Sequence, residues 1–193
     1  MCMEITTTSR LLLRKISADD RELIFRLSEE STLLDNRNLT DGFREALQQY
    51  CWEEVNSADT YNCLVFRRDN GDFVGKVCMQ YIDQPLPELE IDICRDHRGQ
   101  GYGPEAIRAF CNWYAEEFYL SKVKVRINKG NTHSIHIFEK LGANFIGSTS
   151  FVSENALETI KELLPDANLS DLSQDSVREY ILELPITKAK EAL

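Results

Sequence analysis

The sequence of 193 residues predicts a mixed α/β fold, with helices beside a mostly antiparallel, twisted sheet of about seven strands. Alternating apolar runs joined by short turns predict an antiparallel meander in the first half of the chain. A strand, a glycine-rich turn and a long amphipathic helix then follow in direct succession. Since no linker or repeat interrupts this order, we expect a single domain over residues 1–193.

The first half predicts four strands and two helices. The strands are expected at residues 10–16, 61–66, 73–82 and 88–94. Ser17-Ala18-Asp19-Asp20 has the composition of a helix start, and helical periodicity over residues 41–55 predicts a second helix. Asn70-Gly71 predicts a hairpin turn between the middle two strands, because both residues tolerate a positive φ.

The second half predicts three further helices and three further strands. Helices are expected at residues 102–119, 132–141 and 153–164, and strands at residues 122–127, 145–151 and 176–184. Pro104 and Glu105 favour the first turn of the first of these helices, and Gly142 ends the second. Residues 153–175 lie between the last two predicted strands and are expected to form an insertion there, with the helix at 153–164 followed by an acidic loop.

Composition excludes several classes of protein. The net charge is −10, from 32 acidic and 22 basic residues, which argues against nucleic-acid binding. The apolar runs are too short to span a membrane, and the N-terminus lacks the basic-then-apolar order of a signal peptide, so we expect a cytoplasmic protein. The six cysteines show no CxxC spacing, so we expect reduced, mostly buried thiols.

The most informative stretch joins the strand expected at 88–94 to the helix expected at 102–119, and reads Arg98-Gly99-Gln100-Gly101-Tyr102-Gly103-Pro104-Glu105. Three glycines in five residues allow a tight turn and bring backbone N–H groups close to a ligand. The helix start adds further N–H donors and a positive dipole end. Arg98 adds a cation whose planar fork fits phosphate. The stretch therefore predicts a pyrophosphate-binding turn.

Two other interpretations fit parts of this turn. Residues 101–106 fit the dinucleotide fingerprint GxGxxA, but the turn follows several strands, and Pro104 stands where the helix of that fold packs closely. The next strand also ends at Asn128, where a ribose-binding acid is needed, so we reject that interpretation. A sharp strand-to-helix turn without a ligand is the other interpretation, and an isolated Gly-x-Gly would favour it.

The pattern Arg98-x-x-Gly101-x-Gly103 after a strand resembles the acyl-CoA-binding motif of the Gcn5-related N-acetyltransferase (GNAT) family. A second stretch resembles that family's other signature, Asn-x-x-Ser followed by Glu-Lys-Leu-Gly-Phe; here it reads Asn131-Thr-His-Ser134 and then Glu139-Lys140-Leu141-Gly142-Ala143-Asn144-Phe145. The order of strands and helices over residues 10–151 also agrees. The resemblance is closest to the branch of ribosomal-protein N-terminal acetyltransferases (RimJ/RimL-like).

The resemblance implies that a splayed pair of strands holds acetyl-CoA as co-substrate, without a metal. The residues it places against the cofactor are Ile93, Cys94, Arg95, Arg98, Gly99, Gln100, Gly101, Tyr102, Gly103, Asn131 and Ser134. The backbone N–H groups of residues 99–103 would hold the pyrophosphate, and Ile93 and Arg95 would pair with the pantetheine arm. An N–H near Ile93 would face the thioester oxygen. Asn131 would bond the cofactor from the opposite side, with Ser134 near the sulfur or the pantetheine amide.

Three acids alternate with apolar residues in the strand that the family places beside the acceptor. Period two puts Glu88, Glu90 and Asp92 on one strand face, so they are the candidates for the general base. We favour Glu90 and then Glu88. The alternative for each is exposure to water or pairing with Arg or Lys.

One departure from the family pattern affects the general acid. Many members have a tyrosine at the position of Phe138, and phenylalanine cannot donate a proton. Ser134 or a water would then protonate the departing thiolate, or the thiolate would leave without an acid.

Two further groups could suggest other chemistry. His133 and His136 lie three residues apart, but no third metal ligand is evident, so surface or packing roles are favoured. Cys94 could act as a nucleophile, but the family attacks directly and burial as a small apolar residue is favoured.

The leading functional hypothesis is an acetyl-CoA-dependent N-acetyltransferase acting on a primary amine, either a protein N-terminus or a small amine. A non-catalytic CoA-binding sensor or partner subunit is the alternative, and a phosphate-binding module unrelated to CoA is a third. The insertion at 153–175 flanks the acceptor side in this family, so we expect it to shape acceptor choice. Family members are often dimers, which suggests a homodimer; neither a membrane nor a nucleic acid is expected as partner.

Overall fold

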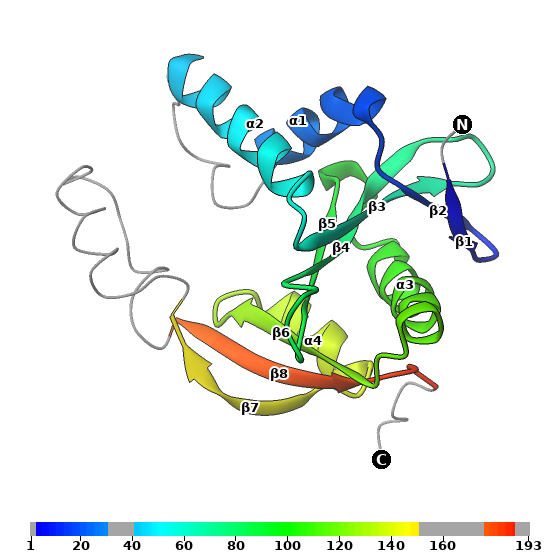
Figure 1. Cartoon of the computed structure of the whole chain (residues 1–193), viewed down its shortest axis with the longest axis vertical. Helices are drawn as coiled ribbons and strands as arrows, with labels where there is room; N and C mark the ends of the chain where they lie inside the picture. Colours follow the sequence, from blue (N-terminus) through cyan, green and yellow to red (C-terminus); the bar gives the residue numbers. More distant parts are fainter. Residues whose placement is uncertain (1–2, 31–40, 151–175, 188–193) are drawn as a thin grey trace, which may run out of the picture. The chain divides into compact units, whose positions relative to one another are not determined.

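The computed structural model describes residues 3–30, 41–150 and 176–187 (Figure 1). The chain divides into two compact units, Met1–Leu120 and Ser121–Leu193. The helix predicted at 153–164, like the rest of the insertion, lies outside the described residues. No helix within the described ranges is long and apolar enough to cross a membrane.

The first unit contains a five-stranded antiparallel meander in the order β1-β2-β3-β4-β5. Its strands are β1 (Glu4–Thr7), β2 (Leu11–Lys15), β3 (Thr60–Arg67), β4 (Phe73–Gln80) and β5 (Glu88–Ile93). One row of paired residues crosses four strands, from Leu13 through Val65 and Gly75 to Ile93. The hairpin predicted at Asn70-Gly71 joins β3 to β4, with Gly71 at φ 77°.

The described residues of this unit also form three α-helices and two short 3₁₀ turns. They are η1 (Ala18–Asp20), α1 (Arg21–Glu29), α2 (Asp41–Val55), η2 (Arg95–His97) and α3 (Tyr102–Phe118). Figure 1 shows α1 and α2 together on one face of the sheet and α3 on the other. Alternation along β3 supplies both faces: Leu64 joins the core under α1 and α2, whereas Tyr61 packs against Tyr114 and Phe118 of α3.

The second unit contains β6 (Lys122–Asn128), α4 (Thr132–Lys140), β7 (Asn144–Thr149) and β8 (Val177–Glu183). β8 pairs antiparallel with both β6 and β7. Alternate residues of β6 are buried, and so are Ile135 and Phe138 of α4. Tyr180 is fully buried in β8 and donates a hydrogen bond from its hydroxyl to Glu139 Oε1 at 3.2 Å.

Every strand predicted for the described residues is present, with ends that differ by at most two residues. The helices expected at 41–55, 102–119 and 132–141 are confirmed as α2, α3 and α4. Strand β1 and the 3₁₀ turn η2 were not predicted; with β1 the described residues hold eight strands. The mixed α/β, mostly antiparallel class is confirmed.

Candidate active site

The glycine turn has the geometry that its composition predicts. Gly99 and Gly101 adopt left-handed φ values of 73° and 78°, which residues with a Cβ rarely adopt. Gly101 is the N-cap of α3, and among the described residues no side chain caps this helix start. The N–H groups in the first turn of α3 therefore form an uncapped donor set with a positive dipole end.

Space around the glycines also suits a close ligand. A Cβ on Gly99 would meet no heavy atom within 4 Å, and one on Gly103 would meet only the Ile93 side chain, at 3.8 Å. The described protein atoms therefore do not require glycine at position 103. Its missing side chain leaves room beside the helix start, as a pyrophosphate-binding turn needs.

Arg98 holds the turn in place through hydrogen bonds to two backbone carbonyl groups, a role that the sequence did not suggest. Its Nε donates to the carbonyl oxygen of Ile93 at 2.9 Å, and its Nη2 donates to that of Glu30 at 3.1 Å. The guanidinium thus ties the turn both to the end of β5 and to the residue after α1. The predicted contact of Arg98 with phosphate stays a prediction.

Arg10 of the β1–β2 connection supports the other side of the turn. Its Nη1 donates to the carbonyl oxygen of Gln100 at 3.0 Å, and its guanidinium lies 4.7 Å from the centre of the buried Tyr102 ring. Glu105 in the first turn of α3 accepts a 2.7 Å hydrogen bond from Arg10 Nε and a second hydrogen bond from Thr8 Oγ1. Arg10 therefore supports the turn at two points, the ring of Tyr102 and the backbone carbonyl of Gln100.

The end of β5 presents backbone groups away from β4. Ile93 pairs with Gly75, and the next residue, Cys94, donates its N–H to Val74 O at 2.9 Å. Because hydrogen-bonded pairs alternate along an antiparallel ladder, the N–H of Ile93 points away from β4. The family resemblance predicts that an N–H near Ile93 faces a thioester oxygen, and the direction of this N–H is compatible with that prediction.

The two residues after Ile93 have different environments. The Cys94 thiol is fully buried in the core beneath α1, and burial, followed by the charge of Glu30, raises its pKa to about 11. The thiol is therefore protonated near neutral pH and packs as a small apolar group, as expected. Arg95 is exposed, and its backbone N–H donates to Glu30 Oε2 at 2.6 Å.

The three acids of β5 face the same side as Lys76 and Gln80 of β4. The strand register pairs Glu88 with Gln80 and Asp92 with Lys76. Glu88 is buried, at 7% exposure, whereas the side chains of Glu90 and Asp92 are 37% and 50% exposed. Glu90 and Asp92 are thus the accessible acids of this face.

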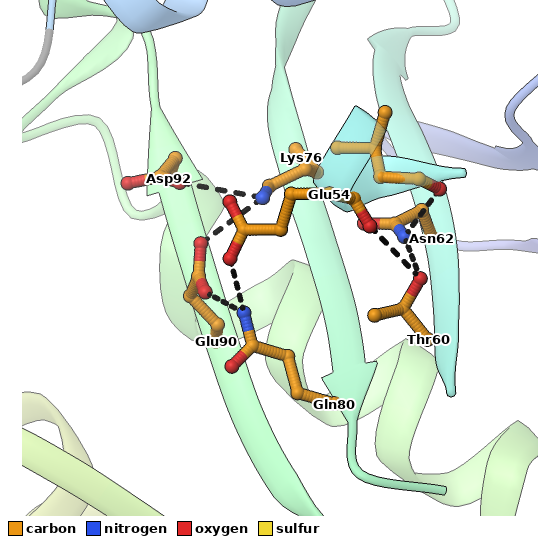
Figure 2. A network of polar contacts seen from close by, with 8 residues as sticks. Glu54, Thr60, Asn62, Lys76, Gln80, Glu90 and Asp92 are labelled. Carbon is orange, nitrogen blue, oxygen red and sulfur yellow. Dashed lines mark hydrogen bonds and ion pairs between the residues drawn. The ribbon is translucent and has the colours of Figure 1, made fainter. Parts of the chain in front are cut away.

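Figure 2 shows Lys76 and Gln80 converging on Glu90. Lys76 Nζ lies 3.0 Å from Glu90 Oε1 and 3.8 Å from Asp92 Oδ2. Gln80 Nε2 donates to Glu90 Oε2 at 2.6 Å and to Glu54 Oε1 of α2 at 3.4 Å. We call Glu54, Lys76, Gln80, Glu90 and Asp92 the acidic cluster.

The carboxyl groups of the acidic cluster differ in pKa. Burial pushes the pKa of Glu90 upward, but the charge of Lys76, together with hydrogen bonds to Asp92 and Lys76, holds that pKa below its usual value. Burial, and then the negative charge of Glu90, raises the pKa of Asp92 to about 7. The same two causes raise the pKa of Glu54. A separation of this kind is typical of acid–base sites.

Sequence reasoning missed Lys76, Gln80 and Glu54. One signal for Lys76 was available, since it is the single charge in the strand FVGKVCMQ, which is apolar apart from Lys76 and the terminal Gln80. Nothing in the sequence connects Glu54 with this strand, because only the packing of α2 on the sheet brings it to Gln80.

The second unit contains the other predicted cofactor residues. Asn131 is the N-cap of α4, where its Oδ1 accepts a hydrogen bond from the N–H of Ser134 at 3.0 Å. Phe138 is a core residue, 2% exposed. His133 and His136 are exposed, and the described residues contain no group of three side chains that could hold a metal.

Solved structures with a similar fold include two from Vibrio cholerae. Spermidine N-acetyltransferase SpeG in complex with CoA and spermine matches at a TM-score of 0.66 and 15% identity, covering 91% of this chain and 96% of that one. A protein assigned as a ribosomal-protein-serine acetyltransferase matches at a TM-score of 0.63 and 23% identity, covering 94% and 97%. At these identities the similarity shows the fold alone.

Relatives and a family model identify the family. The chain is 28% identical over 145 residues to YkkB of Bacillus subtilis, an uncharacterized protein, covering 72% of this chain and 84% of that protein. It is 30% identical over 113 residues to human alpha/beta-tubulin-N-acetyltransferase 9, covering 58% and 52%. The model of the acetyltransferase (GNAT) domain matches residues 10–144. The chain therefore belongs to the GNAT acetyltransferase family.

Proposed function

We propose that this protein is an N-acetyltransferase that moves the acetyl group of acetyl-CoA to a primary amine by direct attack. The observation that carries the proposal is the uncapped start of α3, preceded by left-handed Gly99 and Gly101, in a chain of the GNAT family. An anion with several oxygens suits such a donor set.

The backbone N–H groups of residues 99–103 would hold the pyrophosphate, and the family resemblance adds Ile93 and Arg95 as partners of the pantetheine arm. The Ile93 carbonyl already accepts from Arg98 Nε and the Arg95 N–H already donates to Glu30, so the arm would share or displace these hydrogen bonds. When bound, acetyl-CoA supplies the acetyl group as a thioester. The N–H of Ile93, which points away from β4, is the donor that we assign to the developing oxyanion. The family resemblance adds Asn131 and Ser134 as cofactor contacts, and that part of the proposal depends on the resemblance alone.

Glu90 is the group that we assign as general base. An amine attacks only when neutral, so the site must accept a proton from an ammonium group. Lys76 holds Glu90 ionised, and 37% of the Glu90 side chain is exposed. Glu88 is the second candidate, but its burial leaves less room for an acceptor.

The acceptor class that we propose is a primary amine, either a protein N-terminus or a small amine. The similar structures are named for both kinds, since SpeG is a spermidine N-acetyltransferase and the other protein is assigned to a ribosomal protein. An α-amine with a pKa near 7.8 is about 10% neutral at pH 7, whereas a lysine is about 0.04% neutral, so an α-amine needs less help from a base. A homodimer and a cytoplasmic location remain predictions from the sequence.

One observation favours the alternative of a non-catalytic CoA sensor or partner subunit. Phe138, where many family members carry a tyrosine acid, is a buried core residue and cannot donate a proton to a thiolate. Under the catalytic proposal, Ser134 or a water serves instead, or no acid is needed.

Acetyl transfer from isotope-labelled acetyl-CoA to a panel of amines, read by mass spectrometry, tests the proposal. A thiol-detecting dye is unsuitable because the chain has six cysteines. Transfer to one acceptor class is the expected result. Tight acetyl-CoA binding without transfer to peptides, polyamines or amino acids would support the sensor instead.

A further inference from the structure

Lys76 lies where a charge is costly. It occupies the middle of β4 between buried residues, and only 8% of its side chain is exposed. Burial by itself lowers the pKa of Lys76, but the neighbouring charged forms of Cys78, Glu90 and Asp92 outweigh burial and keep that pKa well above its usual value. A lysine in this position therefore stays charged only because its neighbours are acidic.

The geometry around Lys76 distinguishes Glu90 from its neighbour Asp92. Lys76 Nζ lies 3.0 Å from Glu90 Oε1, within hydrogen-bond distance, but 3.8 Å from Asp92 Oδ2. Gln80 Nε2 occupies the other oxygen of Glu90 at 2.6 Å. Both oxygens of Glu90 thus have a donor, which fixes the carboxylate in one orientation (Figure 2).

One ammonium group cannot neutralise three carboxylates. With Glu54, Glu90 and Asp92 around Lys76, at least one carboxyl takes up a proton more readily than an isolated acid does. The charged and titratable groups that face this cluster from the elements around it are Tyr50, Cys51 and Glu54 of α2, Asp59 after α2, Lys76 and Cys78 of β4, Glu88, Glu90 and Asp92 of β5, and Arg98.

We propose that Lys76 is a positioning residue for acetyl transfer, which selects Glu90 from three neighbouring carboxyls as the ionised proton acceptor and leaves Asp92 and Glu54 to hold any proton that the site retains. This inference rests on the proposed function. Lys76 acts through Glu90 and makes no contact with the reacting atoms in this account.

The pH dependence of kcat/KM in Lys76→Met tests the assignment. Removing the cation destabilises the carboxylates, so the midpoint of the acidic limb moves to higher pH, by about one unit or more. Lys76→Arg keeps the charge and is expected to restore the midpoint to within about 0.3 unit of the wild type. The matched control is Lys124→Met, because Lys124 of β6 also pairs with a glutamate, Glu179, at 3.9 Å. An unchanged midpoint in Lys76→Met would overturn the inference.

A second measurement needs no turnover. Carboxyl ¹³C NMR of the protein alone follows the titration of Glu54, Glu90 and Asp92 directly. In the wild type Glu90 is expected to lose its proton at the lowest pH of the three, and in Lys76→Met this order is expected to disappear. If Lys76→Met does not fold, the double variant Lys76→Met/Asp92→Asn is used, because it removes one positive and one negative charge together. Its reference is the single variant Asp92→Asn. Glu90 is expected to titrate at higher pH in the double variant than in this reference.

The outcomes separate this inference from the proposed function. An inactive wild type that shows the predicted titration order would overturn the proposed function while supporting the assigned order of ionisation. An active wild type in which Asp92 ionises before Glu90 would overturn the role of Lys76 and leave the transferase proposal standing.

Discussion

Gly75 of β4 lies so close to Asp92 of β5 that a Cβ on Gly75 would overlap the carbonyl oxygen of Asp92 and approach the Cα of Ile93 to 3.0 Å. The clash would be with backbone, which cannot turn aside as a side chain does. Glycine at this position therefore lets β5 reach the register that aligns Asp92 with Lys76.

The first prediction concerns this contact. Gly75→Ala is expected to lower the free energy of unfolding by about 1–3 kcal/mol, because the strands must separate locally. Urea denaturation followed by circular dichroism measures the effect. Gly42→Ala in α2 is the control, since a Cβ there meets nothing within 4 Å and alanine favours a helix. Equal stability of Gly75→Ala and the wild type would show that the strands shift without cost.

The second prediction concerns the glycine turn. Gly99→Ala strains a left-handed residue at φ 73° and places a methyl group where the ligand is proposed to approach, so the Kd for CoA is expected to rise at least about tenfold. Isothermal titration calorimetry measures it. Gly71→Ala is the matched control, because its φ of 77° creates the same strain in the β3–β4 hairpin turn. Equal Kd values for CoA in the two variants would show that the glycine turn is not part of the cofactor site.

The third prediction concerns the general base. Glu90→Gln keeps the shape of the side chain but removes its basicity, so kcat is expected to fall by about 10²–10⁴ while the Kd for acetyl-CoA stays within about threefold. Steady-state kinetics with the amine identified in the panel, and calorimetry with acetyl-CoA, give the two values. Glu179→Gln, which also removes a glutamate paired with a lysine, is the control. Unchanged turnover in Glu90→Gln would exclude Glu90 as the base.

The fourth prediction concerns acid stability. Arg14 donates to both oxygens of the buried Asp20, at 2.8 and 2.6 Å, and chiefly these hydrogen bonds hold the pKa of Asp20 below its usual value, against burial. A lowered folded-state pKa stabilises the protein above the unfolded value near 3.9, and this stabilisation is lost as pH falls through the folded value.

Asp20→Asn is therefore expected to cost about 1–3 kcal/mol of unfolding free energy at pH 7 and progressively less below about pH 4. Thermal unfolding at several pH values measures the difference between variant and wild type. A difference that stays constant from pH 7 to pH 2 would show that Asp20 contributes through packing instead of charge.

The local elements could be predicted from the sequence because their causes are local. Apolar alternation predicts β3, β4 and β5, and Asn70-Gly71 predicts their hairpin, since these signals depend on backbone geometry within a few residues. Strand β1 escaped prediction because its four residues, Glu4–Thr7, contain a single aliphatic side chain and are ordered by pairing with β2. The glycine turn was predictable for the same local reason as the hairpin.

What the sequence by itself determined was the family, the glycine turn and the common face of Glu88, Glu90 and Asp92, because motif spacing and period-two alternation are properties of consecutive residues. Only the tertiary structure decided which of these acids lies beside a cation. That choice depends on the register that aligns Lys76 with Asp92, and on the packing that brings Glu54 to Gln80. Electrostatic interactions act through space, so side chains from distant segments set the pKa of a carboxyl as strongly as its neighbours in the chain.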